Sequence, residues 1–128
     1  MIEGFFRERL EVAFPQLKWS ENNYVEQDHT GTIYKEAGGT PDIYETGLQF
    51  PYYMVFIRSS DFDLAQRAAE GSVEIFHRMK EEEYTNYNGD TYEIIFIEAT
   101  ADATRIGRDE SLMEWSSNFK VTLRRKNT

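Results

Sequence analysis

Residues able to perform acid–base or metal chemistry are few and widely spaced in this sequence. Its 128 residues include two histidines, His29 and His77, and no cysteine. Neither histidine lies at ligand spacing from a second histidine or a paired carboxylate, and the lack of cysteine excludes a thiolate zinc site, a thiol nucleophile and a disulfide framework. Asp28 could orient His29 as a general base, but no nucleophile can be assigned to it. We therefore expect a protein that is not an enzyme, with no catalytic residue, metal or cofactor.

Two further patterns fall short of a binding motif. Gly38 and Gly39 lead only into more loop, whereas phosphate-binding glycine loops lie between a strand and a helix. Asp102, Asp109 and Glu110 could bind a divalent cation, but they lack the alternating spacing and closing Glu of an EF-hand. We interpret these acids as solvated loop residues.

The elements that must position any site can be read from the apolar pattern, which predicts two helices. The first is amphipathic and covers residues 2–14. The second covers residues 61–80, because Ser60 and Asp63 form an imperfect capping box and a stripe of small, then bulky, apolar residues follows. Gly71 costs this helix about 1 kcal/mol relative to Ala, so we interpret it as a close-packing point.

Three segments have strong strand patterns. Residues 52–58 (YYMVFIR) are apolar on both faces, which predicts a central strand covered on both sides. In a second buried strand Tyr92, Ile94 and Phe96 share one face. Residues 113–124 alternate between apolar and polar, which indicates a long strand with one wet face. Weaker strand patterns surround Trp19 and Ile33.

These elements predict a mixed α/β (α+β) fold in a single domain over residues 1–128. We expect a twisted, mainly antiparallel sheet of about four to five strands, with helices 2–14 and 61–80 packed against it. A chain of this length can bury a core large enough to be stable without disulfides or metals.

The segment of residues 36–51 is unusually long for a loop in a compact domain, and we expect it to be mobile in the isolated protein. It contains four large apolar or aromatic side chains: Ile43, Tyr44, Leu48 and Phe50. These side chains either bury on a partner or pack back onto the same subunit as a local cap over the sheet.

Charge is distributed unevenly along the chain, whose formal net charge at pH 7 is −9. Residues 21–50 sum to −5 and residues 81–110 to −7, whereas residues 111–128 sum to +3. Such runs are either solvated loops and rims or complementary surfaces of a self-associating subunit, with a basic terminal strand meeting an acidic zone of a neighbour. On the second interpretation the oligomer interface includes Lys120, Arg124, Arg125 and Trp115.

Acidity and hydropathy also limit the partners. Sequence-specific nucleic-acid binding is disfavoured, because phosphate contacts need clustered Lys and Arg. No apolar run approaches the about 20 residues of a membrane-spanning helix, and residues 1–10 carry four charges, unlike a signal peptide. We expect a soluble cytoplasmic protein with no membrane partner.

Three stretches in the second part of the chain carry a family resemblance. They are residues 51–61 (PYYMVFIRSSD), which lead into an alanine-containing helix, residues 106–110 (IGRDE), and residues 115–121 (WSSNFKV) in the last strand. In this order they resemble the tail terminator proteins of long-tailed phages and prophages, also described as minor capsid or tail-completion proteins. The resemblance covers mainly residues 51–128.

The resemblance implies a structural role in the virion tail, after assembly in the cytoplasm of a bacterial host. Such proteins form a homo-oligomeric, hexameric ring that caps the tail tube, meets the head connector or neck protein, and lets DNA pass. We expect the tube contact to lie in the loop, at Ile43, Tyr44, Leu48 and Phe50. Two alternatives are a head-completion or neck connector protein and a small-molecule-binding regulatory domain.

Overall fold

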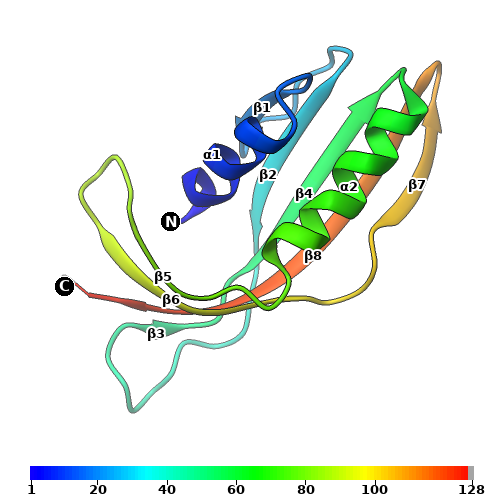
Figure 1. Ribbon diagram of the computed structural model, residues 1–128. Helices are drawn as coiled ribbons and strands as arrows, with labels where there is room; N and C mark the ends of the chain where they lie inside the picture. The colour runs from blue at the N-terminus through cyan, green and yellow to red at the C-terminus, as the bar shows by residue number, and fades with distance from the viewer. Residues whose placement is uncertain (127–128) are drawn as a thin grey trace.

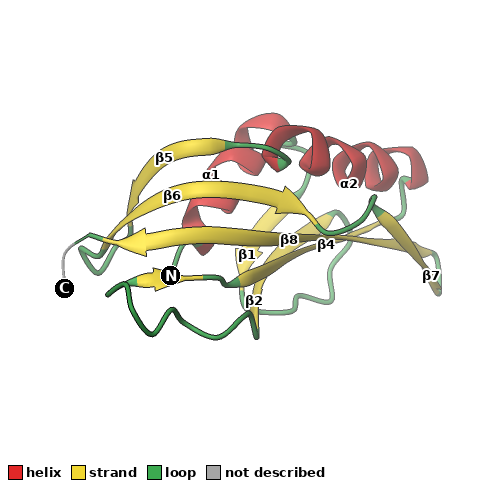
Figure 2. Cartoon of the chain, turned by 90° about the horizontal axis from the view of Figure 1, so that it is seen from below, coloured by secondary structure: helices red, strands yellow, loops and turns green. Residues whose placement is uncertain are grey.

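Two helices lie side by side on one face of a strongly twisted sheet, and within residues 1–126 the opposite face carries no helix (Figure 1, Figure 2). The computed structural model describes residues 1–126. The helices are α1 (Glu3–Ala13) and α2 (Phe62–Phe76). This arrangement confirms a single α+β domain.

Helix α1 is one residue shorter at each end than the predicted 2–14, whereas α2 ends four residues earlier than expected. The predicted end at Lys80 is wrong, because His77 already has an extended backbone and Arg78 a left-handed one, with φ of 72°. The start is close to the prediction, but the N-cap is Asp61, which accepts a hydrogen bond from the Leu64 N–H at 3.1 Å. Ser60 instead donates to the Asp28 carboxylate.

Gly71 is the close-packing point that the sequence predicts. A Cβ at this position would lie 2.4 Å from Cζ of Phe14, so only glycine lets the end of α1 approach α2 this closely. The two helices and the strands beneath them meet in an aromatic cluster. Its fully buried members are Phe5, Phe6, Tyr53, Phe76 and Phe119. Burying each of these rings contributes roughly 1.5–3 kcal/mol.

The sheet has more strands than expected. Within residues 1–126 there are eight: β1 (Lys18–Glu21), β2 (Thr30–Glu36), β3 (Leu48–Gln49), β4 (Tyr52–Ser59), β5 (Lys80–Thr85), β6 (Thr91–Ala99), β7 (Thr104–Asp109) and β8 (Leu112–Arg125). Their order is β1-β2-β4-β8-β6-β5, with β3 and β7 both paired to β8. In the described part of the chain only the β1–β2 pair is parallel, so the mainly antiparallel sheet is confirmed, whereas the expected number of four to five strands is wrong.

The long strand β8 organises the sheet. Its first half pairs with β4 on one side and β7 on the other, and its second half pairs with β3 and β6. The predicted alternation is confirmed, because Ser117, Phe119, Val121 and Leu123 are buried beneath the helices while the residues between Ser117 and Leu123 are partly accessible. Strand β8 therefore joins both ends of the domain.

Two expectations about strand faces are wrong. Strand β4 is covered by helices on one side only, so Tyr53 and Val55 are buried while Met54 is partly accessible on the helix-free face. In β6 the register shifts between Ile94 and Phe96, so Phe96 does not share the buried face. Ile97 lies on the buried face instead, because the bulge between Ile94 and Phe96 reverses which residues of the following part of β6 face the helices.

Candidate functional site

Residues of the predicted tube-contact loop and of the predicted oligomer interface lie together at the carboxyl end of β8. Leu48 of the long loop pairs in register with Arg124 of the basic strand, and the Arg125 N–H donates to the Gly47 carbonyl at 3.0 Å. The connection between β2 and β3 and the turn between β5 and β6 flank this end (Figure 1). We call these two segments the projecting loop (residues 37–47) and the β5–β6 turn (residues 86–90).

The projecting loop is built to expose its tip. The Asp42 carboxylate accepts hydrogen bonds from the N–H groups of Tyr44 and Glu45, each at 2.8 Å, and the Asp42 N–H donates to the Leu48 carbonyl at 3.1 Å. Those two N–H bonds hold the pKa of Asp42 below its ordinary value. Within this closed turn Ile43 is 81% exposed and Tyr44 is 90% exposed. The tip is therefore an apolar pair held outward by hydrogen bonds.

The β5–β6 turn presents a second aromatic side chain at the same end. Asn86 accepts hydrogen bonds from the N–H groups of Asn88 and Asp90, each at 3.0 Å, and Gly89 has a φ of 87° that glycine tolerates best. Tyr87 at the tip is 94% exposed. In the sequence Tyr87 stands out only as an aromatic residue inside a turn-rich segment, a position where Tyr serves either the core or an interface.

The basic end of β8 ties both tips to the sheet. Arg124 pairs with Glu45 of the projecting loop at 2.9 Å, and Arg125 pairs with Asp90 of the turn at 2.8 Å. Lys126 pairs with Glu83 of β5 at 2.8 Å, and this hydrogen bond raises the pKa of Lys126. Each pair is partly or largely exposed, so it fixes position more than it adds stability.

The remaining predicted site residues lie elsewhere. Lys120 lies on the helix-free face, and Trp115 is half-buried on the opposite face, at a groove beside α2. Leu48 and Phe50 are half-buried against the same subunit, as the local-cap interpretation predicts. Ile43 and Tyr44 are exposed, so they do not pack back onto the domain. The four loop residues are therefore divided between the two interpretations.

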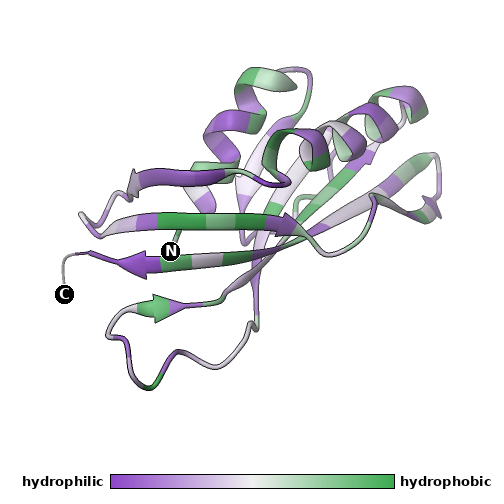
Figure 3. Cartoon of the chain, turned by 60° about the horizontal axis from the view of Figure 1, so that its bottom comes forward, coloured by the Kyte–Doolittle hydropathy of each residue, from purple (hydrophilic) through white to green (hydrophobic). Residues whose placement is uncertain are grey.

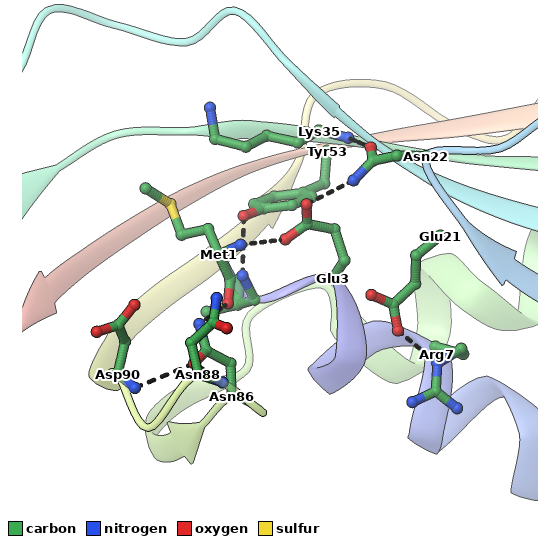
Figure 4. A network of polar contacts seen from close by, with 11 residues as sticks. Met1, Glu3, Arg7, Glu21, Asn22, Lys35, Tyr53, Asn86, Asn88 and Asp90 are labelled. Carbon is green, nitrogen blue, oxygen red and sulfur yellow. Dashed lines mark hydrogen bonds and ion pairs between the residues drawn. The ribbon is translucent and has the colours of Figure 1, made fainter.

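A polar cleft of about 500 Å³ lies beside the first turn of α1 (Figure 4). Glu3 is buried there and accepts hydrogen bonds from the Met1 ammonium at 2.5 Å and from Asn22 at 2.6 Å. Burial alone would raise the pKa of Glu3, but these hydrogen bonds hold it below its ordinary value. Arg7 pairs with Glu21 across the same cleft at 2.5 Å. These acids therefore already have partners within the chain.

The candidate base His29 has a hydroxyl partner but lacks a catalytic arrangement. Its Nδ1 lies 2.7 Å from Oγ of Ser59 and 3.4 Å from the Asp28 carboxylate, so both groups meet the same ring nitrogen. A catalytic triad needs the carboxylate and the nucleophile on opposite nitrogens. Ser59 is also fully buried and accepts the Asp61 N–H, so this cluster fastens a loop to the start of α2.

The loop acids do not converge on a cation site. Asp109 pairs with Arg58 at 2.9 Å, and within residues 1–126 no group of three or more His, Cys, Asp or Glu side chains could hold a metal ion. In the same part of the chain neither helix is long and apolar enough to span a bilayer.

The fold and this end of the molecule define a two-layer α+β domain that presents preorganised apolar tips. No model of a known protein family matches the chain, and no curated protein matches it either. Its function is therefore inferred from this geometry and from the sequence resemblance.

Proposed function

We propose that the chain is a structural virion subunit, a phage or prophage tail terminator that forms a homo-oligomeric ring, caps the tail tube and joins it to the head. The observation that carries this proposal is the pair of apolar tips at one end of the domain. Ile43, Tyr44 and Tyr87 are displayed on turns that hydrogen bonds hold closed. An interaction subunit has a use for such side chains, whereas an isolated domain gains nothing by exposing them.

The geometry of the tips favours docking onto another protein. The hydrogen bonds of the two turns restrict the backbone at the tips, so less backbone entropy is lost when a partner covers the exposed side chains. Asp42 and Glu45 lie beside Ile43 and Tyr44 and give the projecting loop an acidic rim. We therefore expect the tube surface to offer apolar sockets with Lys or Arg around them.

Co-expression with the tail-tube protein of the same phage or prophage tests the proposal. The wild-type chain should give tubes of uniform, limited length in electron micrographs. The double variant Ile43→Ser/Tyr44→Ser should leave tubes of unrestricted length while keeping the thermal unfolding midpoint of the wild type. Val12→Ser is the matched control, because Val12 is also highly exposed but lies on α1.

The outcome also separates the proposal from the closest alternative. A head-completion or neck protein binds the head connector and leaves tube length unregulated. Tubes that grow without limit in the presence of the wild-type chain would therefore overturn the terminator role.

The cleft beside α1 favours a second candidate, a regulatory domain that binds a small molecule. Tyr84 lies at this cleft with its hydroxyl over Gly4, and burial together with the nearby Glu8 and Glu21 raises its pKa. A thermal-shift screen against metabolites tests this function. A ligand that stabilises the wild type by several degrees and has no effect on Tyr84→Ala would support it.

A further inference from the structure

The β5–β6 turn contains a reactive pair of residues beside its exposed tyrosine. Asn88 is followed directly by Gly89, and both are exposed. The backbone nitrogen of the residue after an asparagine can attack the side-chain amide, and glycine hinders this attack least because it has no side chain. The turn therefore brings an electrophilic amide carbon and a nitrogen nucleophile into neighbouring positions.

The side-chain amide of Asn88 is not engaged by the fold. Within residues 1–126 it makes no hydrogen bond, and only the Asn88 backbone N–H is held, by Oδ1 of Asn86 at 3.0 Å (Figure 4). A Cβ built on Gly89 would meet no atom within 4 Å, so the space beside this peptide bond is open. The amide can therefore turn toward the following nitrogen, with room for a cyclic product and for water.

The other asparagines in the described part of the chain lack this combination. Asn22 and Asn86 both use their side chains in hydrogen bonds within the chain. Asn23 is exposed and Asn118 is partly accessible, but a tyrosine follows the first and a phenylalanine the second. Asn88 is therefore the described asparagine that we expect to react first.

The closed turn slows this reaction. The Gly89 N–H donates to the Asn86 carbonyl at 3.0 Å, and the Asn86 N–H donates to the Asp90 carbonyl at 2.9 Å. Oδ1 of Asn86 also accepts the Asp90 N–H at 3.0 Å. Because the Gly89 nitrogen must lose its proton before it attacks, its hydrogen bond has to break first. The rate therefore follows how often the turn opens.

The contacts that keep the turn closed are few and mostly on the surface. Tyr87 at its tip is 94% exposed, and strand β5, which leads into it, is mainly hydrophilic (Figure 3). Arg125 pairs with Asp90 at 2.8 Å, but this pair is partly exposed and adds little stability. Local opening of such a tip costs much less than unfolding of the domain.

We propose that Asn88 is a site of spontaneous deamidation whose rate is set by the hydrogen bonds of Asn86. In the open turn the Gly89 nitrogen gives its proton to solvent base and attacks Cγ of Asn88. A bond forms between these two atoms, the bond from Cγ to the side-chain nitrogen breaks, and that nitrogen takes up a proton and leaves as ammonia. Water then opens the cyclic imide at either carbonyl, which gives aspartate or isoaspartate.

Both products change the turn beside Tyr87. Each adds a carboxylate next to Asp90, in a segment (residues 81–110) whose charges already sum to −7. Isoaspartate also adds a methylene group to the main chain, so the hydrogen bonds to Asn86 lose their register. The modification itself does not depend on what the protein does. Its effect on docking, a weaker tube contact at Tyr87, rests on the proposed function.

Peptide mass spectrometry of the folded chain, kept in warm and mildly alkaline buffer, tests the proposal. The peptide that contains Asn88 should gain about 1 Da and accept a methyl group from an isoaspartate-specific methyltransferase. This gain should be roughly ten-fold or more faster than at Asn23, the matched exposed asparagine. In Asn88→Gln the same peptide should keep its mass.

Two further rates test the role of the closed turn. Asn86→Ala removes the Oδ1 acceptor and should speed the reaction at Asn88 several-fold while circular dichroism shows a folded domain. Wild-type chain unfolded in urea should also react faster than folded chain. Equal rates at Asn88 and Asn23 overturn the proposal, and so does an Asn88 peptide that stays unchanged. Equal rates in folded and unfolded chain overturn the restraint by Asn86.

Tube capping by aged samples separates this inference from the proposed function. Aged wild type should cap fewer tubes than Asn88→Gln aged in parallel. A deamidated chain that caps tubes as well as fresh protein keeps the modification site and removes the β5–β6 turn from the tube contact. Fresh protein that caps no tubes overturns the terminator role and leaves the deamidation chemistry as it is.

Discussion

Two polar connections of similar character behave in opposite ways. The inner loop, residues 22–29 between β1 and β2, folds back onto the domain, whereas the projecting loop, residues 37–47, points its apolar tip away from it. In the inner loop the Tyr24 hydroxyl accepts a hydrogen bond from Arg58 at 2.6 Å, and its ring contacts Phe56. In the projecting loop Tyr44 has no ring contact among the described residues and is almost fully exposed.

The difference lies in what each tyrosine meets on the sheet. Arg58 is 6% exposed on the helix-free face, held by Asp109 at 2.9 Å and lying 3.6 Å from Glu114, too far for a hydrogen bond. The Tyr24 hydroxyl gives this buried guanidinium a further acceptor by taking a hydrogen bond from Nη1, whereas Nε has no hydrogen-bond partner among the described residues. The inner loop is thus part of the fold, while the projecting loop is free to serve a partner.

The largest expected effect is a difference in stability between variants of the two arginines that contact the loops, Arg58 for the inner loop and Arg124 for the projecting loop. Arg58→Met should lower the free energy of unfolding by about 2–3 kcal/mol, because it leaves Glu114 and Tyr24 without their buried partner. Arg124→Met removes only an exposed pair with Glu45 and should cost about 0–1 kcal/mol. Urea unfolding of both variants measures the difference.

Equal losses for the two arginine variants would contradict the comparison. They would mean that the projecting loop is as much a part of the folded domain as the inner loop. A matched check is Arg67→Met, whose exposed pair with Asp63 on α2 predicts a loss like that of Arg124→Met.

The tyrosines give a smaller version of the same contrast. Tyr24→Ala should cost about 1–2 kcal/mol, since it removes a hydrogen bond, a ring contact and the cation–π contact with Arg58 at 5.5 Å. Tyr44→Ala should change stability by no more than about 0.5 kcal/mol, as for other exposed positions without partners. Thermal unfolding measures the change in stability of each variant. A loss of stability in Tyr44→Ala as large as that in Tyr24→Ala would show that Tyr44 packs within the domain.

The sequence predicts the elements whose signal is local. The apolar run of β4 and the long alternation of β8 identify those strands, and the stripe of α2 continues through Gly71. Strands β5 and β7 were missed because their own residues are charged and carry little apolar pattern. They form strands because β6 and β8 offer them hydrogen-bonding partners, which is a non-local cause.

The candidate site could be predicted only in part, for a similar reason. The apolar content of the loop is visible in the sequence, but its division is not. Leu48 is drawn into the sheet by pairing with Arg124, far along the chain, and this pairing leaves Ile43 and Tyr44 in the turn. The sequence also gives no sign that Arg124 and Arg125 form ion pairs with Glu45 and Asp90 of the same chain. For this reason it predicts both arginines as contacts to a neighbouring subunit.

Hydrogen exchange tests the expected mobility of the projecting loop against the inner loop. We expect fast exchange in the projecting loop outside its hydrogen-bonded turn of residues 42–45 in the free protein. Exchange should be slower at Asn22 and His29 of the inner loop, whose N–H groups donate to the Ile33 carbonyl and the Asp28 carboxylate. Binding of tail tubes should slow exchange in the projecting loop alone. Strong protection of that loop in the free protein would refute its mobility and favour the local-cap interpretation for the whole segment.

The smallest expected effect is a response to acid at the two aspartates that close these loops. Hydrogen bonds from Tyr44 and Glu45 lower the pKa of Asp42; for Asp28, burial acts in the raising direction, but bonds from Ser60 lower the pKa. A lowered pKa means that each carboxylate stabilises its loop fully above the ordinary Asp pKa of about 3.9 and stops doing so as the pH falls through the lowered value.

This acid response should loosen the projecting loop first. The inner loop keeps its contacts to Arg58 and Ser59, whereas the tip of the projecting loop depends mainly on Asp42. The amide NMR signals of Tyr44 and Glu45 should therefore shift as the pH falls below the ordinary Asp pKa of about 3.9, while circular dichroism shows the domain still folded. In Asp42→Asn, which keeps an acceptor oxygen but does not titrate, these two signals should not move. If they shift in the variant as in the wild type, Asp42 is not the group that closes the loop.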